Sequence, residues 1–259
     1  MARLGLKGRG TTSVNPYGAF RRSLAAERRW SKAVAVTGAL GSGKTTWTVN
    51  LGLALHRMGR RIALADLDII NPYFCLREIA DDVSRLGIDV VLPPGEARWS
   101  DIPVISPEVT RLLASDRDHL FLDVGGEAKG VLALKQFSPF LEDVGYDFLM
   151  VLNPFRPQTS KPEAVVAMRH EMEKLSGLHV TGLLGNPHLM EETEPEDVAR
   201  GLAMICQTAE VVELPLLYVG VSDHVFERAR EVLAPGAELL WPLSRPILFP
   251  WERSVPLDG

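Results

Sequence analysis

The stretch GALGSGKT, residues 38–45, fits the pattern G-x-x-x-x-G-K-[ST] of a phosphate-binding loop. Such a loop needs glycines because its backbone amides must close around phosphate oxygens, and a Cβ would obstruct that wrap. We expect Lys44 to reach the β- and γ-phosphates of a nucleotide and the Thr45 hydroxyl to ligate Mg²⁺. Amides at the start of the following helix add positive partial charge. The expected phosphate-binding residues are Gly38, Gly41, Ser42, Gly43, Lys44, Thr45 and Thr46.

The segments that flank this loop are the ones a phosphate-binding loop requires. Residues 33–36, AVAV, form a short apolar run that is typical of a buried parallel strand. After the loop, apolar residues recur at helical spacing and Gly59 follows as a helix terminator. A strand, the loop and a helix therefore follow one another, which favours a nucleotide site over a chance glycine-rich turn.

The whole chain alternates short apolar runs with helical patterns. This alternation predicts an α/β fold with a mostly parallel sheet covered by helices on both faces. We expect strands at 33–37, 61–66, 88–92, 118–123, 146–152, 179–185 and about 210–217. We expect helices at 45–58, 129–142, 160–176 and 195–208. In the third helix, a stripe at spacings of three and four is expected to pack in the core, and it comprises Val165, Met168, Met172 and Leu175.

Composition indicates one large globular domain rather than a membrane protein. The chain has 259 residues and 46% hydrophobic content, enough for a sizeable core. No stretch reaches about 18 consecutive apolar residues, so we expect no membrane span. The N-terminus lacks the apolar segment of a secretory signal. The only two cysteines, Cys75 and Cys206, lie far apart, which favours a reducing, cytoplasmic location.

Charge and proline content divide the chain into three regions. Residues 1–32 hold eight basic groups and one acid, a net charge of +7, so the rest carries −5 − 7 = −12. We interpret residues 1–31 as a solvated, partly disordered basic arm; the alternative is that it contacts nucleic acid, anionic lipid or an acidic partner. Residues 32–240 form the expected nucleotide-binding domain. Residues 241–259 contain several prolines and are expected to be an irregular tail, with Trp241 and Trp251 as packing residues.

Acidic residues end two of the expected strands. Asp66 and Asp68 close the run ALADLD, and Asp123 closes the run LFLD. Ligands bind at this edge of parallel sheets, and a hydrated Mg²⁺ would give a buried acid a partner. We expect Thr45 and Asp123 to serve the metal. Of Asp66 and Asp68, one can serve the metal and the other can face the attacking water. Gly126 follows as a γ-phosphate sensor, because its amide can bond the terminal phosphate and release it after hydrolysis.

Two further residues after strands are candidates for weaker reasons. Asn186 has an amide that offers a donor and an acceptor to an adenine edge, although an asparagine before a proline also simply forms turns. Arg156, in the run NPFRP, is either a surface arginine or a contact to phosphate, to substrate or to a neighbouring subunit.

These motifs together resemble the MinD/ParA group of P-loop ATPases. The resemblance rests on GALGSGKTT at 38–46 with Asn50-Leu51, on Asp66-Leu67-Asp68 and on Asp123-Val124-Gly125-Gly126, and it extends over about residues 33–220. It implies a P-loop NTPase fold of the SIMIBI type, binding of ATP and Mg²⁺, slow hydrolysis and nucleotide-dependent homodimerisation. It also implies that Asp68 holds the attacking water and that Asn186 reads adenine, as in the iron-protein branch.

The chain departs from this group at one position. The group often carries a signature lysine directly after the first glycine of the loop, where it reaches the partner's nucleotide, and here that residue is Ala39. The sandwich dimer is therefore in doubt, and Arg156 is the residue that could substitute. The chain has no paired-cysteine motif, so we expect no iron–sulfur cluster.

Three functions are compatible with these features. The leading expectation is an ATPase that switches conformation to act on a protein partner or client. The first alternative is a ligase that uses ATP to join a small carboxylate to an amine, as cobyrinate and dethiobiotin synthetases do. The second is a nucleotide-gated adaptor that binds DNA or a protein through its basic arm.

Overall fold

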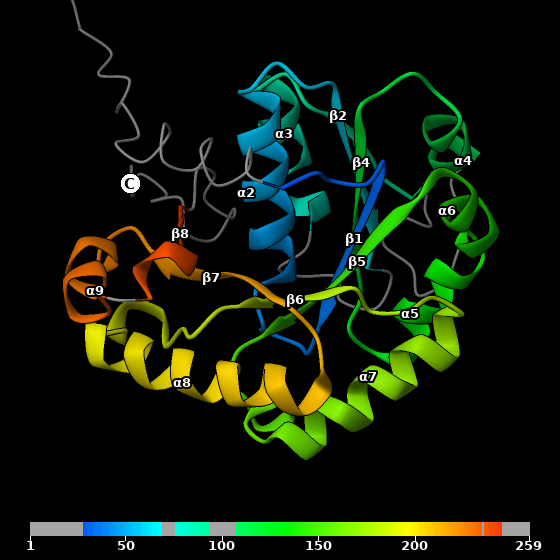
Figure 1. The fold of residues 1–259 in the computed structure, drawn as a ribbon. Coiled ribbons are helices and arrows are strands. Elements are labelled where there is room, and N and C mark those ends of the chain that lie inside the picture. The colour runs from blue at the N-terminus through cyan, green and yellow to red at the C-terminus, as the bar shows by residue number, and fades with distance from the viewer. Residues whose placement is uncertain (1–27, 69–75, 94–106, 235, 245–259) are drawn as a thin grey trace, which may run out of the picture.

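The computed structural model describes residues 28–68, 76–93, 107–234 and 236–244. Within them, eight parallel strands form one sheet in the order β3-β2-β4-β1-β5-β6-β7-β8 (Figure 1). The predicted α/β fold is confirmed. The strands are β1 Ala33–Gly38, β2 Ile62–Leu67, β3 Asp89–Val91, β4 His119–Val124, β5 Tyr146–Leu152, β6 Gly182–Gly185, β7 Leu216–Ser222 and β8 Leu240–Leu243.

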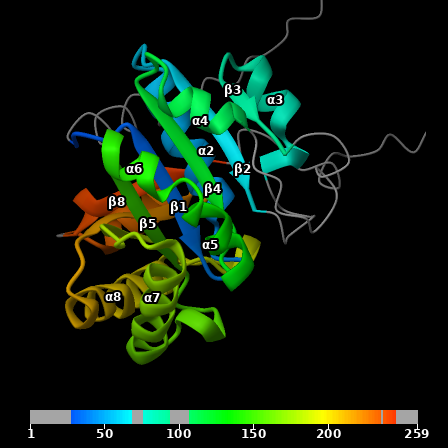
Figure 2. The ribbon, with the colours of Figure 1, turned by 90° about the vertical axis from the view of Figure 1, so that its right-hand side faces the viewer.

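Helices cover both faces of this sheet, with α2 and α3 on one side and α5, α7 and α8 on the other (Figures 1 and 2). The helices are α2 Lys44–His56, α3 Ala80–Arg85, α4 Pro107–Leu113, α5 Ala128–Lys135, α6 Ser138–Val144, α7 Pro162–Ser176, α8 Pro195–Val212 and α9 Phe226–Val232. None of the helices among the described residues has the length and apolar character that crossing a bilayer requires.

The central strands are mostly apolar because both of their faces are covered. In β1, Val34 and Val36 join the core beneath α2, and Ala33 and Ala35 join the core on the opposite face. Successive side chains of a strand point to opposite faces, so a strand buried twice reads as a continuous apolar run. The stripe on α7 also packs in the core as predicted, with Val165 and Met172 fully buried.

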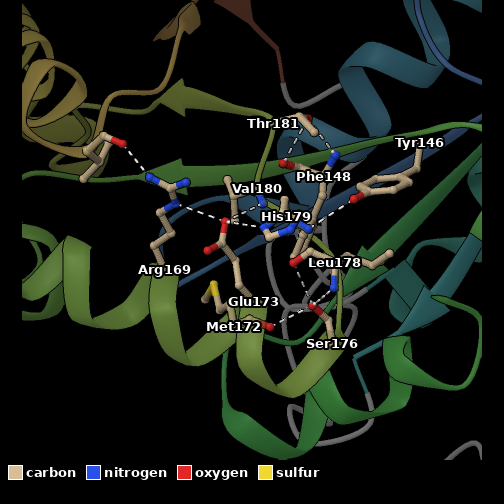
Figure 3. Close-up of polar contacts among 11 residues, drawn as sticks. Tyr146, Phe148, Arg169, Met172, Glu173, Ser176, Leu178, His179, Val180 and Thr181 are labelled. Carbon is tan, nitrogen blue, oxygen red and sulfur yellow. Dashed lines mark hydrogen bonds and ion pairs between the residues drawn. The ribbon is translucent and has the colours of Figure 1, made fainter. Parts of the chain in front are cut away.

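Polar contacts hold α7 against the sheet and against α8 (Figure 3). A Glu173 carboxylate oxygen accepts hydrogen bonds from the Val180 amide at 2.9 Å and from Arg169 Nε at 3.1 Å. Arg169 also donates to the carbonyl of Val212, the last residue of α8, at 2.5 Å. One half-buried carboxylate thereby links α7, the chain entering β6 and, through its arginine, the end of α8.

Two predicted boundaries were wrong. The expected strand at 210–217 begins later, at Leu216, because α8 continues to Val212, with Ile205, Thr208 and Val212 buried at helical spacing. The expected helix at 129–142 is two helices, α5 and α6. Proline near the start of α6 explains the break, because proline is tolerated in a first helical turn and disrupts a helix interior.

The last strand includes residues that we expected in an irregular tail. Residues 241–243 belong to β8, which pairs with β7 at the edge of the sheet. An edge strand tolerates Pro242, because one side of it needs no ladder donor. Trp241 is fully buried, as expected of a packing residue, and its ring lies 5.0 Å from Tyr218 and 5.9 Å from Trp47 on α2. Trp251 lies outside the described residues.

Three of the four described residues before Lys32, namely Arg28, Trp30 and Ser31, contact the domain, whereas Arg29 is exposed. Arg28 forms an ion pair with Asp147 at 2.5 Å, and the Ser31 amide donates to the same carboxylate at 2.9 Å. Trp30 is buried between Phe121 and Tyr218, with ring centroids 6.5 and 6.4 Å away. The basic arm predicted at 1–31 is therefore shorter at its C-terminal end, and residues 1–27 lie outside the described residues.

Candidate nucleotide site

The glycine-rich loop runs from the end of β1 to the start of α2 and follows a path that needs glycine. Gly41 and Gly43 have φ values of +72° and +96°, in the left-handed region that glycine adopts without strain. A Cβ on Gly38 would lie 2.5 Å from the carbonyl oxygen of Val151 in β5, and one on Gly43 would collide with the Asn186 side chain. The loop is thus held against the ends of β5 and β6.

The start of α2 leaves polar groups available to an anion. Gly43 caps the helix without a side-chain hydrogen bond, so the first-turn amides have no side-chain acceptor at the cap. The Ser42 hydroxyl is buried and has no hydrogen-bond partner among the described residues. Lys44 and Thr45 are also buried, and Thr46 is half-buried, with its carbonyl accepting from Asn50 at 2.8 Å. Unpaired donors at a helix N-terminus favour phosphate binding.

Asp123 lies beside the loop and fits a metal ligand. One of its carboxylate oxygens accepts a hydrogen bond from the Thr45 hydroxyl at 2.6 Å. The other oxygen is buried without a hydrogen-bond partner among the described residues. Burial, together with the neighbouring charge of Asp66, raises the pKa of Asp123 to about 7. A buried carboxylate oxygen that lacks a partner, next to a threonine hydroxyl, suits Mg²⁺, which prefers hard oxygen ligands.

Asp66 is engaged by a residue that sequence reasoning missed. It pairs in register with Asp123 across β2 and β4, yet its oxygens accept from the Arg77 side chain at 2.9 Å and from the Asp68 amide at 2.9 Å. Burial raises the pKa of Asp66, and the Arg77 guanidinium opposes that rise. Both oxygens therefore have donors, and Asp66 holds Arg77. Its role as a metal ligand stays a prediction.

Arg77 also explains why two acids can be buried together at the sheet edge. It lies 11 positions after Asp66, in the 3₁₀ turn Leu76–Glu78, and is itself buried. Its guanidinium donates to the backbone carbonyl of Asp68 as well as to Asp66. No motif marks it in the sequence; the only available signal was the need of adjacent buried carboxylates for a cation.

Asp68 meets the loop lysine and the turn after β4. Its carboxylate lies 3.9 Å from Lys44 Nζ, and both side chains are buried. A Cβ on Gly125 would lie 2.8 Å from Asp68 Oδ1, and a Cβ on Gly126 would collide with the carbonyl of Gly38. The turn therefore needs glycine in order to approach both the loop and Asp68. The phosphate-binding loop, Asp68, Asp123 and the turn at Gly126, all predicted from sequence, lie at one edge of the sheet.

Asn186 touches the loop directly. Its side-chain amide donates to the Ser42 carbonyl at 2.7 Å, and its backbone amide donates to the Leu152 carbonyl at 2.8 Å. These bonds tie the end of β6 to the loop and to the end of β5. Contact with an adenine base stays a prediction for this residue.

Arg156 lies beside Gly41 of the same loop. A Cβ on Gly41 would be 3.3 Å from its Nε and 3.4 Å from its Cζ, so the guanidinium lies against that glycine. All the site residues singled out from the sequence are therefore gathered around the loop, with Arg77 added to them.

Residues 34–194 match the model of the CobQ/CobB/MinD/ParA nucleotide binding domain, which is more than half of the chain. The chain belongs to this family. The CobQ/CobB/MinD/ParA match begins inside β1 and ends just before α8, so it includes the loop, the three acids, Arg77, Arg156 and Asn186. No curated protein sequence matches the chain.

Solved structures agree with this family assignment at the level of the fold. The cell division protein FtsY from Thermotoga maritima is 18% identical, with 79% of this chain and 68% of that chain covered and a TM-score of 0.54. FtsY from Mycoplasma mycoides is 15% identical over 79% and 68% of the two chains, with a TM-score of 0.53. These likenesses show a P-loop NTPase fold of the SIMIBI type. The Pyrococcus furiosus cell division ATPase MinD is 22% identical over 73% and 82%, with a TM-score of 0.45.

Proposed function

We propose that this protein binds ATP with Mg²⁺ and hydrolyses it, and that its ATP-bound and ADP-bound states act differently on a protein partner. The observation that carries the proposal is the placement of Asp68, buried 3.9 Å from Lys44 Nζ and beside the turn at Gly125. An acid this close to the phosphate-binding lysine can orient a water molecule toward the terminal phosphate.

The chemistry assigned to the site is largely electrostatic. Lys44 and the loop amides stabilise charge on the phosphate oxygens, and Asp68 orients the attacking water and accepts its proton. Thr45 and Asp123 would hold Mg²⁺, which neutralises phosphate charge when bound. Asp66 acts through Arg77: the pair fixes the backbone of Asp68, whose carbonyl Arg77 contacts. In this scheme Asp66 positions the site.

A switch is favoured because the parts that would sense the terminal phosphate touch one another. Gly126 abuts Gly38, and the Thr37 hydroxyl donates to the Gly125 carbonyl at 3.4 Å. An amide of this turn that bonds the terminal phosphate would lose its partner on hydrolysis. The turn leads directly into α5, so its movement would reach a surface helix.

Residue 39 is alanine, so no cation is available from the position of the signature lysine. We propose that the protein switches as a monomer or through a dimer different from the family's sandwich, and that it works in the cytoplasm. Sedimentation with and without ATP tests the proposed oligomeric state. A dimer that forms only with ATP, and that needs no cation of the loop other than Lys44, would contradict the proposal.

The central test compares wild type with Lys44→Ala, Asp68→Asn and, as a control, Lys135→Ala. Lys135 is an exposed lysine of α5. We expect Lys44→Ala to abolish ATP binding measured by titration calorimetry, and Asp68→Asn to bind ATP but release phosphate roughly 10²–10⁴-fold more slowly. Normal turnover in Asp68→Asn would remove its assigned role. The same measurements with GTP give the nucleotide preference. Phosphate release from ATP in the absence of any small carboxylate or amine substrate distinguishes a switch ATPase from a ligase.

A further inference from the structure

Arg156 is held by a rigid turn that presents its guanidinium to the phosphate-binding loop. Its backbone amide donates to the Asn153 carbonyl at 3.0 Å, and its carbonyl accepts from the Thr159 amide at 3.0 Å. Asn153 is fully buried, and its side chain accepts from the Phe155 amide at 3.1 Å. The turn after β5 is thus hydrogen-bonded at each step, so the side chain of Arg156 starts from a fixed point beside Gly41.

The charge of this guanidinium has no counterpart in the described part of the chain. The Nε of Arg156 is buried and has no hydrogen-bond acceptor there, and no described carboxylate pairs with the side chain. An arginine cannot shed its proton, and a buried donor without an acceptor is unfavourable. Arg200, whose guanidinium lies 5.1 Å from the ring of Phe155 next door, has an acid at 2.7 Å, namely Asp197.

The other cations at the loop already face acids. Lys44 lies 3.9 Å from Asp68, and Arg77 lies 2.9 Å from Asp66. Among the described side chains at this sheet edge, Arg156 is therefore the cation whose charge is not shared with a carboxylate. A planar guanidinium with several donors matches phosphate oxygens in geometry as well as in charge.

We propose that Arg156, from its place beside Gly41, contacts a phosphate oxygen of the bound nucleotide. It would be a second phosphate-binding cation in addition to Lys44. The inference rests on the proposed function, since it needs a nucleotide in the loop. The contact is made within one chain, so it requires no second copy.

The test measures ATP and ADP affinity by titration calorimetry, with Mg²⁺, for wild type and variants of Arg156. We expect Arg156→Ala and Arg156→Gln to bind at least one of the two nucleotides about tenfold more weakly, since charge-assisted hydrogen bonds to phosphate are strong. Arg156→Lys should recover part of the loss because it keeps the charge. Arg200→Ala, which removes a neighbouring arginine with its own acid partner, should bind as wild type does.

The outcomes separate the inference from the proposed function. A loss with ATP alone places the contact on the terminal phosphate, and a loss with both nucleotides places it nearer the base. Wild-type affinities in Arg156→Gln would overturn the inference while leaving the function intact. An equal loss in Arg156→Lys and Arg156→Gln would also overturn it, because charge would then be irrelevant. A wild type that binds neither nucleotide would overturn the proposed function itself.

Discussion

At the scale of single residues, the protonation of Asp123 depends on the site around it. Its Oδ1 is buried with no hydrogen-bond partner among the described residues, and Asp66 lies opposite it in the sheet. The pKa of Asp123 is raised to about 7 from an ordinary value of 3.8. Without a metal, the folded protein therefore favours the protonated carboxyl. A bound metal ion would compete with the proton for the carboxylate oxygen of Asp123.

This gives a pH-dependent stability with a defined sign. The folded state keeps a proton that the unfolded state has released, so the free energy of unfolding in EDTA should fall as pH rises from about 4 to about 7. Asp123→Asn lacks this contribution. Its stability relative to wild type should therefore increase from pH 5 to pH 8 in urea titrations followed by circular dichroism.

Two results would argue against this account of Asp123. One is a difference between Asp123→Asn and wild type that does not change with pH. The other is a stabilisation of wild type by Mg²⁺ with nucleotide that is no larger at pH 8 than at pH 6. We expect this stabilisation to be larger at pH 8, and to be small for Asp123→Asn at either pH, because a metal and a proton compete for the same oxygen.

Residues of the site were predictable where a local pattern marks them. The loop glycines, Lys44 and Thr45 follow from one motif, and Asp68 and Asp123 follow from their places at strand ends. The pairing of Asp66 with Arg77 was not predictable in this way. It joins positions 11 apart through a turn whose path no local pattern specifies, and it gives Asp66 a cationic donor that no motif predicts.

At the scale of elements, the parallel sheet and its helical layers follow from alternating apolar runs, whereas the strand order comes from the structure alone. The errors occur where local signals conflict. Pro242 and its neighbouring prolines indicate a tail, but pairing with β7 and burial of Trp241 make residues 240–243 a strand. The end of α8 was placed too early because helix boundaries depend on tertiary packing as much as on caps.

The β8 strand should contribute substantially to stability. Trp241 is fully buried between Tyr218 and Trp47, so Trp241→Ala should lower the free energy of unfolding by about 3–5 kcal/mol, and Trp241→Phe should lower it less. Val232→Ala, at an exposed position of α9, is the control and should change stability by less than about 0.5 kcal/mol. Urea unfolding of the three variants measures this, and a Trp241→Ala value near that of the control would show that β8 is dispensable.

At the scale of the whole molecule, residues 28–31 cover the end of the sheet at which the parallel strands begin. Arg28 neutralises Asp147, and Trp30 fills the space between β4 and β7 by contacting Phe121 and Tyr218. This closure lies at the sheet edge opposite the nucleotide site. It belongs to the folded domain although its sequence resembles the rest of a basic arm.

Two truncations test this boundary. A chain that begins at Arg28 should be more stable than one that begins at Lys32 by about 3–5 kcal/mol, because the shorter chain loses a buried tryptophan and leaves Asp147 without its arginine. Trp30→Ala in the longer chain separates the ring from the ion pair. Equal urea midpoints for the two truncated chains would place the domain boundary after residue 31.

The aromatic rings described above form a continuous row. Trp30 lies 6.4 Å from Tyr218, Tyr218 lies 5.0 Å from Trp241, and Trp241 lies 5.9 Å from Trp47, on the helix that begins at the phosphate-binding loop. Indole emission responds to small changes in the surroundings of the ring. The protein therefore carries a built-in optical reporter, and intrinsic fluorescence can follow nucleotide arrival at the loop in real time without any attached dye.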